Sequence, residues 1–170
     1  TKAEYATKIR LFATEKGLFV SADMEQPPET LVERLTRRDD WVDRDLFGVT
    51  IDASGEAKLG YWFYVALGNS LNDGKVLPER RFQRDWDGPW TAKAARRATG
   101  WSAEMYLPWS MMDMPQRDGL RNMGFVASRM VSHRNQRYQW PGYGVTTKRY
   151  VSAFNRLQMD DVEPVRQKSV

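Results

Sequence analysis

Apolar and polar residues alternate with a period of two along most of the chain. Near the amino terminus, Ile9, Leu11 and Ala13 alternate with polar residues, and a turn at residues 15–17 leads into a second alternating segment, residues 18–24. Side chains that alternate in this way lie on one face of a β-strand. The pattern therefore predicts that the chain opens with a β-hairpin.

Two further strand patterns, residues 47–51 and 61–67, are separated by a turn-like sequence at residues 53–56. In the second of them, both alternating sets of side chains are apolar. Such a strand is typical of the centre of a sheet, or of a sheet whose outer face meets a ligand or a partner. Residues 69–87 are rich in Gly, Asn, Asp and Arg, which predicts a long loop with only a weak strand near residues 76–77.

The second half of the chain shows the same alternation in shorter segments. Residues 101–107 alternate cleanly and precede one helical turn at residues 109–114. Residues 123–129 begin another strand, and residues 154–159 predict a last one. Aromatic residues punctuated by Gly and Pro predict a loop at residues 138–144.

Together these segments predict one domain with an all-β fold, an antiparallel β-sandwich of the immunoglobulin-like or jelly-roll type with long loops. A length of 170 residues suits a single domain, and 41% apolar residues are enough for a packed core. We expect the sandwich to occupy residues 1–160 and residues 161–170 to be a linker or tail. No apolar run approaches the roughly 20 residues that a membrane-spanning helix needs.

The composition excludes several classes of chemistry. The chain has no Cys and a single His, His133, which excludes disulfides, thiolate metal sites, cysteine nucleophiles and multi-histidine metal sites. The formal net charge of +4, from 26 basic and 22 acidic residues, is scattered along the chain. A nucleic-acid binder usually concentrates its basic residues on one face. We therefore expect no nucleic-acid partner.

The acidic residues leave two alternatives open. A pair of carboxylates could hydrolyse a glycosidic bond if the two faced each other across a cleft, and the candidates for such a pair are Asp39, Asp40, Asp43, Asp45, Asp85 and Asp87. The acidic run at residues 39–45 also offers the oxygen ligands that calcium prefers, but it lacks the spacing of an EF-hand loop. Because Asp beside turns normally caps the chain, we expect no enzyme, no catalytic residue, no metal site and no cofactor, with calcium kept as the alternative.

Aromatic residues are the unusual feature of the composition, with seven Trp, seven Tyr and seven Phe. Trp101 lies in the apolar register of its strand and is expected in the core, whereas the position of Trp62 is undecided. Five other aromatic residues lie in or beside loops, where a ring exposes apolar area unless it packs or binds a ligand. Such rings can stack on sugars. The candidate ligand-binding aromatic residues are Trp41, Trp86, Trp90, Trp140 and Tyr143.

Several short motifs add a family resemblance that runs from Ile9 to Leu157. The most specific is the pattern Gly-Trp-x-x-Glu-x-x-x-Pro at residues 100–108. The other motifs are residues 37–40, 45–52, 61–65 and 86–90, residues 123–125 with Arg129, and Trp140 with residues 154–157. With these motifs the sequence resembles the carbohydrate-binding module family 9-like domains, which are related to the DOMON sandwiches.

The resemblance implies a sandwich that holds a terminal sugar between two aromatic rings, with Trp41 and Trp140 at the corresponding positions. It also adds Arg129 to the candidate ligand-binding residues. Sugar-binding members usually carry a Glu in the strand where this chain has Gly48 and an Arg in the next strand, where it has Tyr64. Two polar contacts to sugar are therefore missing, although such contacts normally give orientation and specificity.

The resemblance is greatest to the amino-terminal domain of a bacterial group in which a region like an outer-membrane β-barrel follows. This implies export to the periplasm or cell surface, with membrane association only through a carboxy-terminal region absent from this sequence. We expect a non-catalytic binding domain whose ligand is carbohydrate. The alternative is a structural or interaction domain that packs on the outer-membrane barrel or on a partner without binding sugar.

Overall fold

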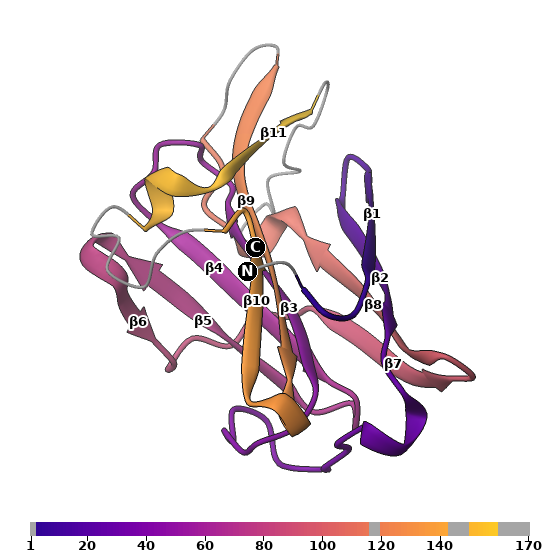
Figure 1. The fold of residues 1–170 in the computed structure, drawn as a ribbon. Helices are drawn as coiled ribbons and strands as arrows, with labels where there is room; N and C mark the ends of the chain where they lie inside the picture. The colour runs from indigo at the N-terminus through magenta and orange to yellow at the C-terminus, as the bar shows by residue number, and fades with distance from the viewer. Residues whose placement is uncertain (1–2, 116–119, 143–149, 160–170) are drawn as a thin grey trace.

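The fold is an all-β sandwich of two antiparallel sheets (Figure 1). The structure, a computed structural model, describes residues 3–115, 120–142 and 150–159. Within these ranges the helical segments are 3-10 turns of three residues each, and none of the described helices is long and apolar enough to cross a membrane. The expected fold class is confirmed.

One layer, the small sheet, has four strands in the order β1-β2-β8-β7. The hairpin predicted at the amino terminus forms its first two strands, and Leu11 lies opposite Val20 in their register. Its strands are β1 (Thr7–Ala13), β2 (Gly17–Glu25), β7 (Thr91–Arg97) and β8 (Gly100–Pro108). β1 and β7 are the two edges of this sheet in the described part of the chain.

The other layer, the large sheet, has seven strands in the order β10-β9-β3-β4-β5-β6, with β11 also paired to β9. Its strands are β3 (Leu46–Asp52), β4 (Gly60–Ala66), β5 (Leu71–Leu77), β6 (Arg81–Gln83), β9 (Arg121–Val131), β10 (Gln136–Trp140) and β11 (Asn155–Met159). β9 is long enough for β11 to pair with its first half and β10 with its second half, on the same edge.

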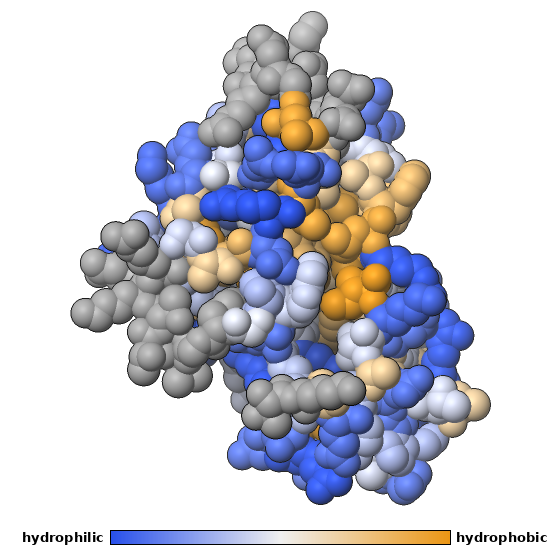
Figure 2. All heavy atoms as spheres, turned by 45° about the horizontal axis from the view of Figure 1, so that its top comes forward, coloured by the Kyte–Doolittle hydropathy of each residue, from blue (hydrophilic) through white to orange (hydrophobic). Residues whose placement is uncertain are grey.

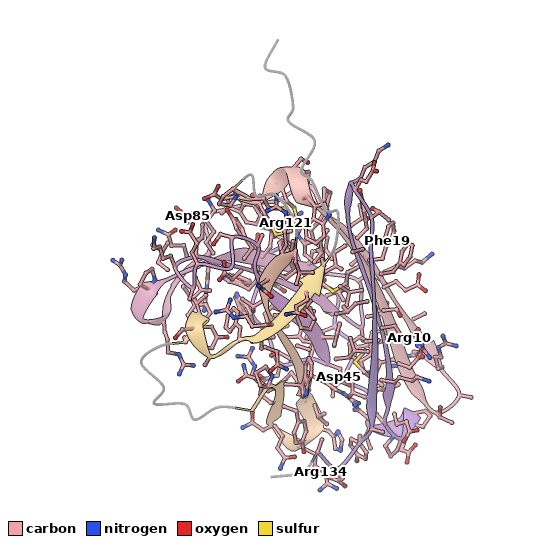
Figure 3. All side chains as sticks on the ribbon, turned by 90° about the horizontal axis from the view of Figure 1, so that it is seen from above. Arg10, Phe19, Asp45, Asp85, Arg121 and Arg134 are labelled. Atoms are coloured by element: carbon pink, nitrogen blue, oxygen red, sulfur yellow. The ribbon has the colours of Figure 1, made fainter. Side chains whose placement is uncertain are left out.

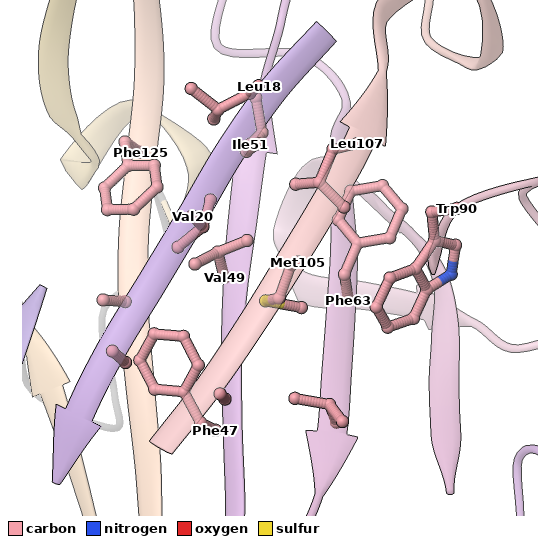
Figure 4. Close-up of a cluster of buried hydrophobic side chains, with 14 of the residues drawn as sticks. Leu18, Val20, Phe47, Val49, Ile51, Phe63, Trp90, Met105, Leu107 and Phe125 are labelled. Atoms are coloured by element: carbon pink, nitrogen blue, oxygen red, sulfur yellow. The ribbon is translucent and has the colours of Figure 1, made fainter. Parts of the chain in front are cut away.

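The main core lies between the two sheets and is built from the inward-facing residues that the alternation predicted (Figure 4). Val20 of β2, Val49 of β3 and Leu107 of β8 are buried in it, and each such side chain contributes about 1.5–3 kcal/mol of apolar burial. Trp101 is 1% exposed, so its predicted core position is confirmed.

A second apolar cluster covers the outer face of the large sheet. Trp62 and Tyr64 of β4 pack there with Val126 of β9 and with Tyr150 and Phe154, which precede β11. This cluster explains why β4 is apolar on both faces, and it places Trp62 in a buried position at 2% exposure.

Two loop predictions were wrong. Residues 71–77 form β5, although Asn, Asp and Gly have low strand propensity, because their polar groups find buried partners. The Asn72 side chain accepts a hydrogen bond from Arg44, and the Asp73 carboxylate accepts two from Arg38. Residues 138–140 belong to β10, where pairing with β9 outweighs the turn-like composition.

Candidate functional site

Trp41 stands on the outer face of the large sheet, and its ring is exposed on an aromatic base. The side chain is 39% exposed, and its ring centroid lies 5.8 Å from that of Trp62 and 6.0 Å from that of Tyr64. Hydrogen bonds fix the base, because Trp62 Nε1 donates to the Lys75 carbonyl and the Tyr64 hydroxyl donates to Ser128 Oγ. The arrangement gives an aromatic platform, which we call the Trp41 platform.

Two exposed arginines border the Trp41 platform. The guanidinium carbon of Arg84 lies 5.1 Å from the Trp41 ring centroid, and that of Arg137 lies 5.5 Å from the Tyr64 ring centroid. Guanidinium groups offer several N–H donors beside an apolar surface. Sequence reasoning missed both arginines. Arg137 could have been found only from its register on β10, opposite the outward-facing Met130.

The two residues that depart from the sugar-binding pattern, Gly48 and Tyr64, pack directly against each other. Gly48 lies directly opposite Tyr64 in the pairing of β3 with β4. A Cβ atom at Gly48 would lie 2.6 Å from Cε1 of Tyr64 and 2.5 Å from the carbonyl oxygen of Phe63. The Tyr64 ring therefore occupies the space above Gly48, and it supports Trp41 where the resemblance would place polar sugar contacts.

Trp140 lies on the opposite face of the large sheet from Trp41. It pairs with Ala127, which points into the main core, and its ring centroid lies 6.4 Å from that of the buried Phe125. Its side chain is 56% exposed. Because the two rings are on different faces, Trp41 and Trp140 do not form the clamp that the resemblance implied.

Trp140 instead lines an apolar groove of about 630 Å³ between β1 and β10, which we call the edge groove. The groove opens at the side of the sandwich, where Figure 2 shows apolar residues at the surface between polar regions. Its main side chains are Tyr5, Ile9, Leu11, Phe125, Tyr138 and Trp140.

Three of the predicted site residues lie in or against the core. Trp90 is 3% exposed and packs edge-on against Phe63. Trp86 is half-buried, with its ring centroid 5.1 Å from that of Tyr61, and it carries the Lys75 ammonium over its face. We therefore assign both tryptophans to packing rather than to the Trp41 platform. Tyr143 lies outside the described residues.

Arg129 is the third, and it fastens the two sheets together at one end of the edge groove. It is 3% exposed, and it donates hydrogen bonds to Thr7 Oγ1, to Gln26 Oε1 and to the carbonyl oxygens of Ala6 and Glu25. Burial lowers the pKa of the guanidinium, and the nearby Asp45 opposes this shift. All four NH1 and NH2 protons are thereby used within the fold, which gives Arg129 a structural role.

The carboxylates of Asp39, Asp73 and Asp87 are close enough to hold a cation, with ligand oxygens within 4.8 Å of one another. The Arg38 guanidinium already lies among them, at 2.7 Å from Asp73, 3.2 Å from Asp87 and 3.8 Å from Asp39. Burial raises the pKa of Asp39, with the Asp73 and Asp87 charges adding to the effect. The geometry shows an arginine held by three carboxylates.

Among the carboxylates considered for hydrolysis, Asp39 and Asp87 lie close together but are both paired with Arg38, and Asp45 and Asp85 do not meet. Asp45 is fully buried, and its carboxylate accepts hydrogen bonds from Gln26 Nε2 and from the backbone N–H groups of Val32 and Ser132. Asp85 lies at the periphery, away from Asp45 (Figure 3). Carboxylates in these positions do not face each other across a substrate cleft.

Comparisons with known proteins support the fold. No family model and no curated protein matches the sequence. A predicted carbohydrate-binding protein from Bacteroides uniformis matches with a TM-score of 0.71 and 12% identity, over 92% of this chain and 79% of that chain. A carbohydrate-binding module of family 9 from Caldicellulosiruptor kristjanssonii, solved with cellotriose, matches with a TM-score of 0.64 and 13% identity, over 98% of this chain and 84% of that one.

The same organism's family 9 module solved with glucose matches with a TM-score of 0.57 and 14% identity, over 82% of this chain and 66% of that one. At these identities the likeness concerns the fold. The chain therefore has the same sandwich fold as family 9 carbohydrate-binding modules.

Proposed function

We propose that this domain binds carbohydrate without catalysis and that the sugar stacks on Trp41. The observation that carries the proposal is the Trp41 platform, an exposed indole on a fixed aromatic base with Arg84 and Arg137 beside it. Aromatic rings supply affinity for the apolar face of a sugar, and guanidinium N–H groups bind its hydroxyl or carboxylate oxygens. Structural neighbours solved with cellotriose and glucose support carbohydrate as the class of ligand.

The platform favours a particular mode of binding. Because Trp140 lies on the other face of the sheet, no second tryptophan closes over the sugar from that position. A single stacking ring can accept an internal stretch of a polysaccharide as well as its end. The two arginines favour sugars that carry carboxylate or sulfate groups over neutral ones, because charge-assisted hydrogen bonds are the stronger ones.

Calorimetric titration with neutral and acidic oligosaccharides tests the proposal. We expect Trp41→Ala to weaken binding by about tenfold or more, which is the scale of about 1.4 kcal/mol for a lost stacking contact. The matched control is Trp140→Ala, which removes the other exposed indole and should leave the affinity unchanged. Binding that survives Trp41→Ala, or that Trp140→Ala abolishes, would show that the sugar site lies elsewhere.

A second candidate function is that of an interaction domain in an exported protein. The edge groove supports it, since an exposed apolar surface of this kind is typical of interaction sites. Export is supported by the sequence resemblance alone. Fractionation of cells that produce the protein from its natural gene tests export. Recovery of the protein only in the cytoplasm would contradict export.

A further inference from the structure

β1 borders the edge groove with unpaired backbone groups as well as with apolar side chains. In the described part of the chain, β1 is an edge strand of the small sheet. The Glu25 N–H donates to the Ala6 carbonyl, so even-numbered residues of this segment pair with β2. Pairing groups alternate along an antiparallel strand. Ile9 and Leu11 therefore direct their N–H and C=O groups away from β2, toward the free edge.

The same two residues also line the edge groove with their side chains. In the register of β1 with β2, Ile9 lies opposite Ala22 and Leu11 opposite Val20, both core residues. Ile9 and Leu11 nevertheless remain only partly buried. A strand added at this edge would pair with their backbone and bury their side chains in one step, which is the geometry of β-strand addition.

The outward face of β1 carries positive charge. Lys8 and Arg10 alternate with the apolar residues, and Arg10 and Arg97 both contact the single carboxylate of Asp23. These three cations lower the pKa of Asp23, with the hydrogen bond from Arg10 as the largest cause. Three cations around one carboxylate leave an excess of positive charge, which an acidic partner would complement.

The charge pattern disfavours a second copy of this chain as the occupant. If β1 paired antiparallel with itself about Ile9, Lys8 of each copy would lie opposite Arg10 of the other. Like charges directly opposite each other destabilise a sheet pairing, and charged residues on an edge strand are a common device against self-association. The partner strand must therefore differ from β1 in charge.

We propose that the edge groove binds an extended peptide strand that pairs with β1 and in which apolar and acidic side chains alternate. The apolar side chains enter the groove against Phe125 and Trp140, and the acidic ones face Lys8 and Arg10. This site lies on the other side of the large sheet from the Trp41 platform. The two sites are therefore independent, and one can exist without the other.

Fluorescence anisotropy with labelled synthetic peptides tests the charge and the pattern. The probe is a short peptide in which valine alternates with glutamate, and the matched control replaces glutamate with lysine. We expect the glutamate peptide to bind the wild-type chain about tenfold more tightly or better, a difference of about 1.4 kcal/mol. Lys8→Glu should reduce this preference. No binding of the glutamate peptide, or equal binding of both peptides, would overturn the proposal.

A proline variant tests the pairing with β1. Ile9→Pro removes an N–H at the free edge without removing a bond to β2, a position in which edge strands tolerate proline. We expect about tenfold weaker binding of the glutamate peptide, from one lost hydrogen bond and the lost apolar contact. Phe12→Ala is the control, since Phe12 is 66% exposed and is not among the groove residues. Unchanged binding by Ile9→Pro would overturn the proposal.

Amide hydrogen exchange of the wild type gives a readout that does not depend on a variant. The peptide should slow exchange at the amides of Ile9 and Leu11, whereas those of Lys8 and Arg10 are already protected by β2. Continued fast exchange at Ile9 and Leu11 with peptide bound would contradict strand addition. Trp41→Ala should leave peptide binding unchanged, so failure of the sugar site and failure of this site are distinguishable.

Discussion

At the scale of single residues, buried arginines hold loops and sheet edges in place. Arg129 is the clearest case, because its guanidinium bonds to both β2 and the segment before β1. Arg129→Met should lower the free energy of unfolding by about 3 kcal/mol, since it removes four hydrogen bonds to a charged group and leaves the buried Gln26 Oε1 without its arginine donor. Urea denaturation measures this. The exposed Arg137→Met is the control and should change stability by less than about 0.5 kcal/mol. If Arg129→Met also lowered the free energy of unfolding by less than about 0.5 kcal/mol, the structural role of Arg129 would be contradicted.

Arg38 allows a test of the calcium alternative. The guanidinium holds the place of a cation among Asp39, Asp73 and Asp87, so calcium and a chelator should leave the melting temperature of the wild type unchanged. Arg38→Ala should lower that temperature and make it rise again with added calcium, because three carboxylates then lack a counter-charge. Arg96→Ala, which removes an exposed pair with Glu33, is the control. Calcium stabilisation of the wild type would show that Arg38 does not exclude the ion.

Residue type and loop position could not separate exposed from buried tryptophans. Trp41 and Trp90 both lie beside loops in the sequence, yet one is 39% exposed and the other 3%. What separates them is the face of β4 against which each ring packs, because Trp41 lies over Trp62 on the outer face and Trp90 lies against Phe63 in the main core. A single sequence does not contain that information. Arg84 and Arg137 were missed for the same reason, because only the folded sheet brings them to the Trp41 platform.

At the scale of strands, the pairing of β3 with β4 shows a close fit between a glycine and a ring. Gly48→Ala should lower the free energy of unfolding by about 2 kcal/mol, because its methyl group would meet the Tyr64 ring and the Phe63 carbonyl. Adding Tyr64→Ala should give a double variant that is less destabilised than the sum of the two single changes, by about 1 kcal/mol. Denaturant unfolding of the four proteins measures the coupling, and strict additivity would show that the ring does not cover Gly48.

Strands with a regular apolar face toward the main core could be predicted from the sequence, and strands stabilised by distant polar partners could not. β2, β3, β4 and β8 have apolar residues at every second position because one face meets the main core. β5 has Asn72 and Asp73 in fully buried positions. Their partners Arg44 and Arg38 lie about thirty residues earlier in the chain, so no local pattern predicts that strand.

At the scale of the whole molecule, the register of β10 decides what the domain can bind. A shift of one residue in the pairing of β10 with β9 would move Trp140 to the outer face, because side chains alternate between faces. In the observed register, Trp140 lies opposite Ala127 and lines the edge groove. Among the described residues, Trp41 is then the one exposed tryptophan on the outer face. The resemblance predicted that Trp41 and Trp140 form a pair. The sequence does not reveal that they lie on different faces, because the register of β10 is set only in the folded sheet.

The open side of the sandwich leads to the last prediction, which concerns self-association. Like charges at Lys8 and Arg10 would oppose each other if this edge strand paired with itself, so we expect that replacing both with valine allows dimers to form. The pair of Arg10 with Asp23 is exposed, so its loss should cost little stability. Sedimentation should show a dimer that grows with concentration for the double variant. The charge-conserving Lys8→Arg with Arg10→Lys should remain monomeric, as should the wild type. A monomeric valine variant would show that charge does not protect this edge.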